Sequence, residues 1–133
     1  MDDCLRRAAA AQRVAMERAL APLEITPAQF AALEIVADAG GVSSAEVARI
    51  ERLTPPTMSV IVANLERKGA LVRRPHPTNA RIQCLEATEH GLDLLHNGRA
   101  RLEALRKQVA AAIPGDARVT IRAWLLRVAE IDV

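Results

Sequence analysis

Positive charge is concentrated in one stretch of this chain. Residues 52–81 hold six basic side chains and one acid, Glu66, a net charge of +5, whereas the whole chain of 133 residues carries only +2. The basic residues are Arg52, Arg67, Lys68, Arg73, Arg74 and Arg81. Clustered lysine and arginine side chains bind phosphate groups and are typical of nucleic-acid-binding surfaces. The pattern makes double-stranded DNA the first candidate partner.

Residues that could catalyse a reaction or bind a metal are sparse. The chain has no glycine-rich phosphate loop, no clustered Cys and His ligands and no nucleophile with a base nearby, so we expect no catalytic residue, no metal and no cofactor. His90, Asp93 and His96 recur every three residues, but this spacing drifts about 60° around a helix at each step, so only neighbouring pairs could share a metal. We interpret Cys4 and Cys84, far apart in sequence, as two reduced thiols.

The basic stretch begins with two expected helices. After the break at 40–41, Ser43 or Ser44 can cap a short helix that ends before Thr54. Thr54 is followed by two prolines, which fit the first turn of a helix, and this second helix should run to Gly69. We expect the apolar side of the first helix to consist of Ala45, Val47, Ala48 and Ile50.

The second helix has one apolar stripe and one face of small side chains. The stripe, expected to be buried, is Met58, Ile61, Val62 and Leu65. The opposite face is Pro56, Ser59, Val60, Ala63, Asn64 and Arg67. So small a face suits close approach to the major groove of DNA, although an ordinary exposed face would look the same on this helix alone.

A basic hairpin follows and favours the DNA interpretation. Residues 71–74 and 81–86 are short extended runs, and the connector between them contains two prolines and an asparagine. Two helices followed by a hairpin predict a winged helix-turn-helix, in a chain that is mainly α with a small β-hairpin wing. The expected DNA-binding residues are Ser44, Pro56, Thr57, Ser59, Val60, Asn64, Arg67, Arg73, Arg74 and Arg81, with the three wing arginines facing one DNA backbone together.

The terminal segments carry further amphipathic helices. Residues 5–23 and 28–38 have helical spacing, a long helix should run from Thr88 to about residue 113, and a last one follows the break at 114–116. Their apolar surface exceeds what a lobe of this size needs and predicts a homodimer, unless these helices pack on the lobe of their own chain. The expected dimerisation residues are Leu5, Met16, Leu95, Leu102, Leu105, Val109, Trp124, Leu125 and Val128.

The run LTPPTMSVIVANLERKGALVRR and the wing resemble the MarR family of regulators. The family wing pattern is D-x-R, five residues, then L-T-x-x-G, and this chain has Asn79-Ala80-Arg81, five residues, then Ala87-Thr88-Glu89-His90-Gly91. The spacing is intact, but family members usually have other residues at Asn79, Ala80 and Ala87, and often at Val60 and Ala63. In the family an acid on the recognition helix pairs with a wing arginine. Both positions, Ala63 and Ala80, are alanine here, so we expect a less tightly fixed wing.

The resemblance implies a single domain over residues 1–133, with a winged-helix lobe at 26–91 and dimerisation helices at 1–25 and 92–133. It implies a cytoplasmic, homodimeric, sequence-specific repressor that reads an inverted-repeat operator. Such a repressor is either released from DNA by a small aromatic or lipophilic effector or left constitutively bound, and an aromatic content of only 2% fits the absence of a ligand equally well. Some relatives sense oxidants through a cysteine near the position of Cys4, but with supporting tyrosines, which this chain lacks. No apolar run approaches the roughly 20 residues that span a bilayer, so no membrane partner is expected. The alternative is a winged-helix module that binds a protein and no longer reads DNA.

Overall fold

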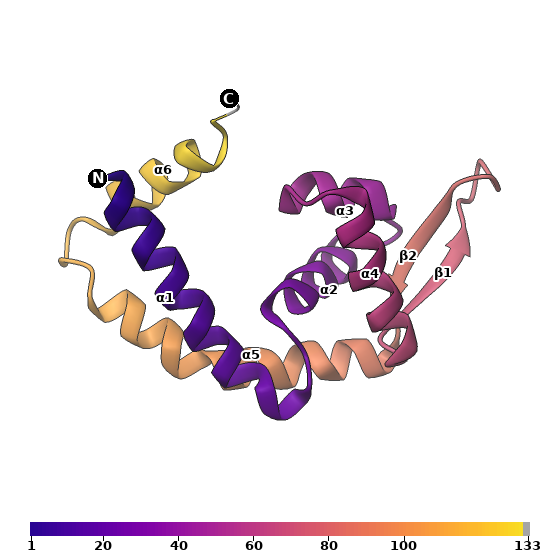
Figure 1. The fold of residues 1–133 in the computed structure, drawn as a ribbon, viewed down its shortest axis with the longest axis horizontal. Helices are drawn as coiled ribbons and strands as arrows, with labels where there is room; N and C mark the ends of the chain where they lie inside the picture. Colours follow the sequence, from indigo (N-terminus) through magenta and orange to yellow (C-terminus); the bar gives the residue numbers. More distant parts are fainter. Residues whose placement is uncertain (132–133) are drawn as a thin grey trace. The chain divides into compact units, whose positions relative to one another are not determined.

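The computed structural model describes residues 1–131, which are mainly helical with one two-stranded antiparallel sheet (Figure 1). The elements are α1 (Asp2–Leu20), the 3-10 helix η1 (Ala21–Leu23), α2 (Pro27–Ala39), α3 (Ser44–Glu51), α4 (Pro55–Arg67), β1 (Leu71–Pro75), β2 (Gln83–Ala87), α5 (Glu89–Ala111) and α6 (Arg118–Ala129). The expected fold class is confirmed. The chain divides into two compact units, Met1–Leu102 and Glu103–Val133, and α5 belongs to both.

Side-chain caps start the helices of the lobe where the sequence predicts them. Ser43, not Ser44, caps α3 by accepting a hydrogen bond from the backbone N–H of Glu46 at 3.2 Å. Thr54 caps α4 ahead of the two prolines. Gly69 follows the end of α4 with φ of 74°, a left-handed conformation that glycine adopts without steric cost and that turns the chain into β1.

The core of the first unit gathers side chains from α2, α3, α4, the hairpin and the start of α5. The stripe predicted on α4 is confirmed, since Met58, Ile61, Val62 and Leu65 are all buried. The apolar side predicted for α3 is too wide. Val47 and Ala48 are buried, but Ala45 is exposed and Ile50 is 58% exposed. At about 100° per residue Ile50 lies about 110° from the midline between Val47 and Ala48, and an eight-residue helix buries only a narrow stripe.

The start of α5 is held against the turn that follows α4. Thr88 caps the helix by accepting a hydrogen bond from the N–H of Gly91 at 3.0 Å, and its own N–H donates to the carbonyl of Ala70 at 3.0 Å. A Cβ added to Gly91 would lie 2.2 Å from that same Ala70 oxygen. The glycine of the T-x-x-G pattern is therefore required by a close backbone approach.

Two leucines expected to face a partner chain are instead buried in this one. Leu95 and Leu102 are each only 2% exposed, so a second chain has almost no surface of theirs left to cover. Gly98 lies between these two leucines on α5 and packs against the ring of Phe30, where an added Cβ would approach to 2.4 Å. This corrects the assignment of Leu95 and Leu102 to a dimer interface, because both side chains belong to the core of the protomer.

Two glutamates, Glu34 on α2 and Glu51 on α3, form an acidic pair within the first unit. Glu34 on α2 accepts a hydrogen bond from the Arg99 guanidinium at 3.3 Å. Burial, reinforced by the negative charge of Glu34, raises the pKa of Glu51 above its ordinary value of 4.5. The folded chain therefore binds a proton at Glu51 more tightly than the unfolded chain does, so this group opposes folding at neutral pH and the opposition fades as pH falls through the raised pKa.

We expect Glu51→Gln to increase the free energy of unfolding at pH 7, because it removes a desolvated charge and keeps the shape of the side chain. The gain should shrink as the pH is lowered towards 4.5, because protonation of the wild-type carboxyl in the folded state removes the desolvated charge. Urea unfolding at several pH values measures it. Glu130→Gln, at an exposed position after α6, is the control and should show no such pH-dependent gain.

Within residues 1–131, no single helix is both long and apolar enough to cross a membrane. The pair formed by residues 2–23 and 27–39 reaches the required length and composition only together, and it is bent by 77°.

Candidate nucleic-acid interface

The outer face of α4 is a ridge of four residues that points away from the core. Taken at about 100° per residue, Pro56, Val60, Ala63 and Arg67 all lie about 150° or more from the midline of the buried stripe. All four are exposed, and Val60 is 61% exposed. The small face predicted for this helix is thus present at the surface, with its one charge at the C-terminal end.

Two of the polar candidates on α4 already have partners. The Asn64 side-chain oxygen accepts a hydrogen bond from the Arg67 guanidinium at 2.7 Å, which leaves the amide NH₂ of Asn64 as a donor. Thr57 takes part in the cap, because its hydroxyl oxygen accepts from the Thr54 hydroxyl at 3.0 Å. Ser59 is exposed beside the ridge, and Ser44 is half-buried at the start of α3. Asn64 and Arg67 therefore act as a pair, and Thr57 contributes to the helix start.

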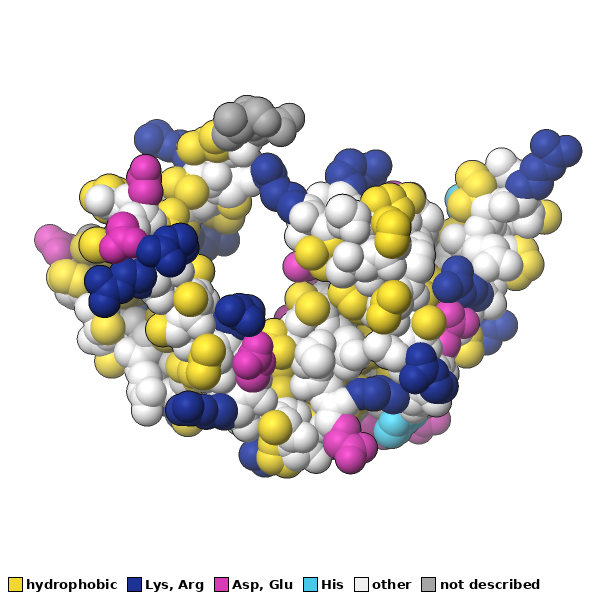
Figure 2. All heavy atoms as spheres, in the orientation of Figure 1, with side chains coloured by type: hydrophobic (Ala, Val, Ile, Leu, Met, Phe, Trp, Pro, Cys, Tyr) yellow, Lys and Arg dark blue, Asp and Glu magenta, His cyan; other side chains and the backbone are white. Residues whose placement is uncertain are grey.

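The hairpin places its arginines on different faces. β1 and β2 are antiparallel, with Arg73 opposite Leu85 and Arg74 opposite Cys84. Successive side chains of a strand point to opposite faces of the sheet, so Arg73 and Arg74 cannot face one DNA backbone together. This corrects the expectation for the three wing arginines. Lys and Arg side chains are visible along the hairpin and at its tip in Figure 2.

Each strand arginine is paired with a carboxylate. The Nε of Arg73 donates to Glu66 at the end of α4 at 2.9 Å, and the Nε of Arg74 donates to Glu86 on β2 at 2.7 Å. Both bonds use Nε, so the terminal NH₂ groups of each guanidinium remain available to a phosphate. Glu86 lies just outside the stretch counted as +5, and it lowers the charge that the hairpin presents. Lys68 also has a partner within the chain, because its Nζ donates a hydrogen bond to the side-chain oxygen of the buried Gln29 at 3.4 Å.

The wing is fixed by contacts that the alanines at 63 and 80 do not supply. Glu66 and Arg73 join α4 to β1, in place of the family pair. At the tip, the Asn79 side-chain oxygen accepts from the backbone N–H of Arg81 at 3.2 Å, as an aspartate would. These two contacts hold the wing in this structure, and the looser wing expected from the alanines at 63 and 80 stays a prediction. Within residues 1–131 the Arg81 side chain has no carboxylate partner, and it is exposed near the tip.

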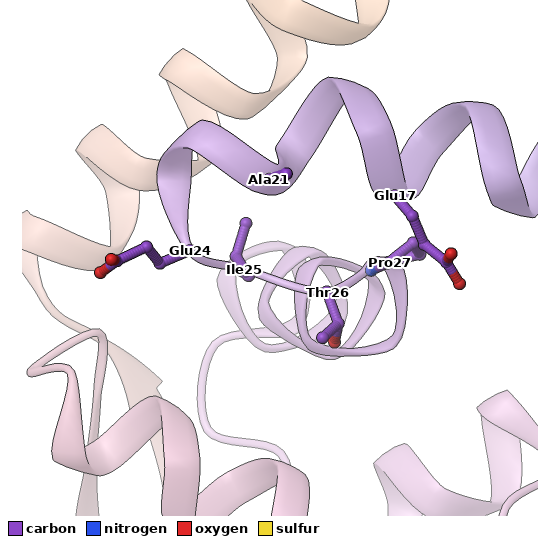
Figure 3. Close-up of a pocket in the computed structure, with 6 residues that line it drawn as sticks. All are labelled: Glu17, Ala21, Glu24, Ile25, Thr26 and Pro27. Atoms are coloured by element: carbon purple, nitrogen blue, oxygen red, sulfur yellow. The ribbon is translucent and has the colours of Figure 1, made fainter.

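Metal ligands, cysteines and pockets are the remaining candidate sites. Among residues 1–131 no group of three or more His, Cys, Asp and Glu side chains could hold a metal ion. Cys4 is exposed and Cys84 is buried. A shallow hollow of about 260 Å³ lies where α1, η1 and the start of α2 meet (Figure 3). It is lined by Glu17, Ala21, Glu24, Ile25, Thr26 and Pro27, and the two glutamates extend away from each other at opposite ends of it.

The expected dimerisation residues outside the core remain accessible. Val109 on α5 and Leu125 on α6 are 47% and 43% exposed, and Leu126, which the pattern did not single out, is 50% exposed. The remaining members, Leu5, Met16, Leu105, Trp124 and Val128, are half-buried in the single chain.

Comparison with known proteins connects this geometry to one family. The MarR family profile matches residues 23–82. HTH-type transcriptional repressor Rv2887 of Mycobacterium tuberculosis is 36% identical over 118 residues, which are 89% of this chain and 78% of the relative. A crystal structure of Rv2887 with p-aminosalicylic acid has a TM-score of 0.76 at 26% identity, covering 98% of both chains.

Two further structures share the fold. CouR from Rhodococcus jostii RHA1, bound to p-coumaroyl-CoA, has a TM-score of 0.87 at 26% identity and covers 98% of this chain and 92% of its own. A mutant of MarR from E. coli, complexed with operator DNA, has a TM-score of 0.85 at 20% identity, with coverage of 96% and 91%.

Two helices joined by a short turn, a basic hairpin and a long following helix define a winged helix-turn-helix protein. With the sequence relatives above, the protein is a DNA-binding transcriptional regulator. The chain belongs to the MarR family. This result favours DNA binding over the alternative of a module that binds only proteins.

Proposed function

We propose that this chain is a homodimeric repressor that acts in the cytoplasm and reads an inverted-repeat operator, with α4 in the major groove and the hairpin along the backbone. Residues 26–91 form the DNA-binding lobe, and residues 1–25 and 92–133 supply the dimer helices. A two-fold dimer presents two copies of α4 to half-sites about one helical turn apart. We expect no catalytic activity from a member of a family of regulators.

The observation that carries the proposal is the outer ridge of α4 beside guanidinium groups that retain free donors. Pro56, Val60 and Ala63 are small enough for the helix backbone to come close to base edges. Arg67 lies on this ridge and Arg73, Arg74 and Arg81 lie on the hairpin, and we assign all four to phosphates. Because Arg73 and Arg74 point to opposite faces of the sheet, we assign these two to phosphates of different DNA strands. We assign Ser44, Thr57, Ser59 and Asn64 to the groove or its edges.

The experiment that tests the proposal is selection of bound duplexes from a random library, followed by measurement of affinity against salt concentration. We expect an enriched palindromic sequence and binding that weakens steeply with salt. Recovery of no enriched sequence would contradict sequence-specific reading by this protein.

Arg81→Ala should weaken binding to the selected duplex and to random DNA alike. Because a dimer would lose two phosphate contacts and each contact releases about 0.9 counterion, the salt slope should flatten by roughly two. Arg6→Ala, which removes the same charge from an exposed position on α1, is the matched control and should leave the slope unchanged. An unchanged slope for Arg81→Ala would mean that the wing tip does not contact the backbone.

We further propose that a small aromatic or lipophilic effector releases the protein from DNA by binding in the hollow between α1 and α2. Structures of relatives contain p-aminosalicylic acid or p-coumaroyl-CoA. The hollow here is apolar at its centre with Glu17 and Glu24 at its ends, which disfavours a ligand that carries a carboxylate and favours a neutral aromatic compound.

Phenol should therefore release the DNA complex at lower concentration than p-aminosalicylic acid does, as measured by fluorescence anisotropy of a labelled duplex. Ala21→Phe fills the hollow and should abolish the response to phenol while leaving DNA affinity intact. Release of the Ala21→Phe complex at the wild-type phenol concentration would place the effector elsewhere.

A further inference from the structure

The centre of the α4 ridge is occupied by an apolar side chain that no other part of the described chain covers. Val60 is 61% exposed, and its neighbours along the ridge, Pro56 and Ala63, are small and also exposed. In Figure 2 hydrophobic side chains stand at the surface over α3 and α4, beside the positively charged hairpin. The residue best placed to touch base edges is therefore one that can neither donate nor accept a hydrogen bond.

Only one base offers an apolar partner at the floor of the major groove. Thymine carries a methyl group at C5, cytosine presents only a small C5–H there, and the other main edge groups of the bases are hydrogen-bond donors or acceptors. A valine placed against guanine O6 or a cytosine amine would leave that polar group without a partner, which is costly once water is excluded. Contact with a methyl group removes apolar surface of both partners from water.

We propose that Val60 determines part of the operator sequence by contacting the C5 methyl group of one thymine in each half-site. This inference rests on the proposed function, in which α4 enters the major groove. The polar groups at the sides of the ridge fit the same arrangement. Ser59 and Asn64 lie about 110° from the buried midline, one on each side of Val60. Asn64 keeps its NH₂ donor because Arg67 occupies only its oxygen.

The test removes the methyl group alone. In the duplex selected by this protein from a random library, each thymine is replaced in turn by deoxyuridine, which has the same hydrogen-bonding edge but no C5 methyl. We expect one thymine per half-site whose replacement weakens binding about fourfold, as for the burial of one methyl group, and no such change at the other thymines.

The same scan with Val60→Ala makes the assignment specific. The variant should bind the original duplex more weakly and should no longer distinguish thymine from deoxyuridine at that position. Because Val60 is exposed, the substitution leaves the core of the lobe unchanged. Val119→Ala on α6 deletes the same atoms from a side chain that is 80% exposed, and this control should keep the full deoxyuridine effect.

Two results would overturn the inference. If no thymine responds, or if Val60→Ala retains the wild-type response, then another residue reads the methyl group or none does, although specific DNA binding stands. If the library yields no enriched sequence, the proposed function fails, and the inference that rests on it fails for that separate reason.

Discussion

Gly91→Ala should destabilise the fold by about 3 kcal/mol, at the upper end of the range for overpacking a well-packed site. The new Cβ would lie 2.2 Å from the Ala70 carbonyl oxygen. That oxygen is a backbone atom that accepts the hydrogen bond from Thr88, so it cannot move aside without breaking the junction between the turn after α4 and the start of α5. Urea unfolding followed by circular dichroism measures the loss.

Gly115→Ala is the matched control for this prediction. A Cβ at Gly115 meets nothing within 4 Å, and the residue does not have a positive φ. The substitution should leave stability unchanged or raise it slightly, because alanine has fewer conformations than glycine to lose on folding. Equal stability of Gly91→Ala and the wild type would show that α5 starts farther from Ala70 in solution.

Leu125→Glu should dissociate the proposed dimer and should therefore abolish tight binding of a palindromic operator. Leu125 is 43% exposed in the single chain, so a carboxylate there is hydrated in the monomer and loses water only when a second chain covers it. An unpaired charge in that interface should cost about 3 kcal/mol or more. Sedimentation should detect monomers, and affinity for the palindrome should fall towards that of one half-site.

Gln108→Glu is the control, because it adds the same charge at an exposed position of α5 without removing an apolar group. It should leave the dimer intact. The choice of Leu125 follows from the burial of Leu102, since Leu102→Glu would unfold the protomer and report nothing about association. A Leu125→Glu protein that sediments as a dimer would exclude this part of α6 from the interface.

Local signals were sufficient to predict the helices and the hairpin. Thr54 followed by two prolines starts α4, and Gly69 turns the chain after it, because caps and left-handed positions depend on a few neighbouring residues. The buried stripe of α4 follows from helical periodicity alone. The exposed ridge opposite it was predictable for the same reason.

The partners of the wing arginines were not predictable in this way. Glu66 and Arg73 belong to a helix and a strand, and Arg74 and Glu86 to two strands, so their pairing depends on tertiary structure. The role of Leu95 and Leu102 was missed because the spacing of apolar residues on α5 is the same whether the stripe faces its own lobe or a second chain. Only the burial of Leu95 and Leu102 in the folded chain distinguishes these two arrangements.

The carboxylates on Arg73 and Arg74 also bear on how the protein finds its operator. A genome offers about 10⁶ to 10⁹ competing sites, so occupancy depends on the ratio of specific to random affinity rather than on either alone. Attraction to random DNA comes almost entirely from net charge, and Glu66 and Glu86 each offset one arginine before any DNA is bound. In the proposed complex the same arginines would donate to phosphates from their terminal NH₂ groups, in orientations that the carboxylates have already set. We therefore expect these ion pairs to shorten residence on random sequence while keeping directed contacts at the operator, and so to speed the search for it.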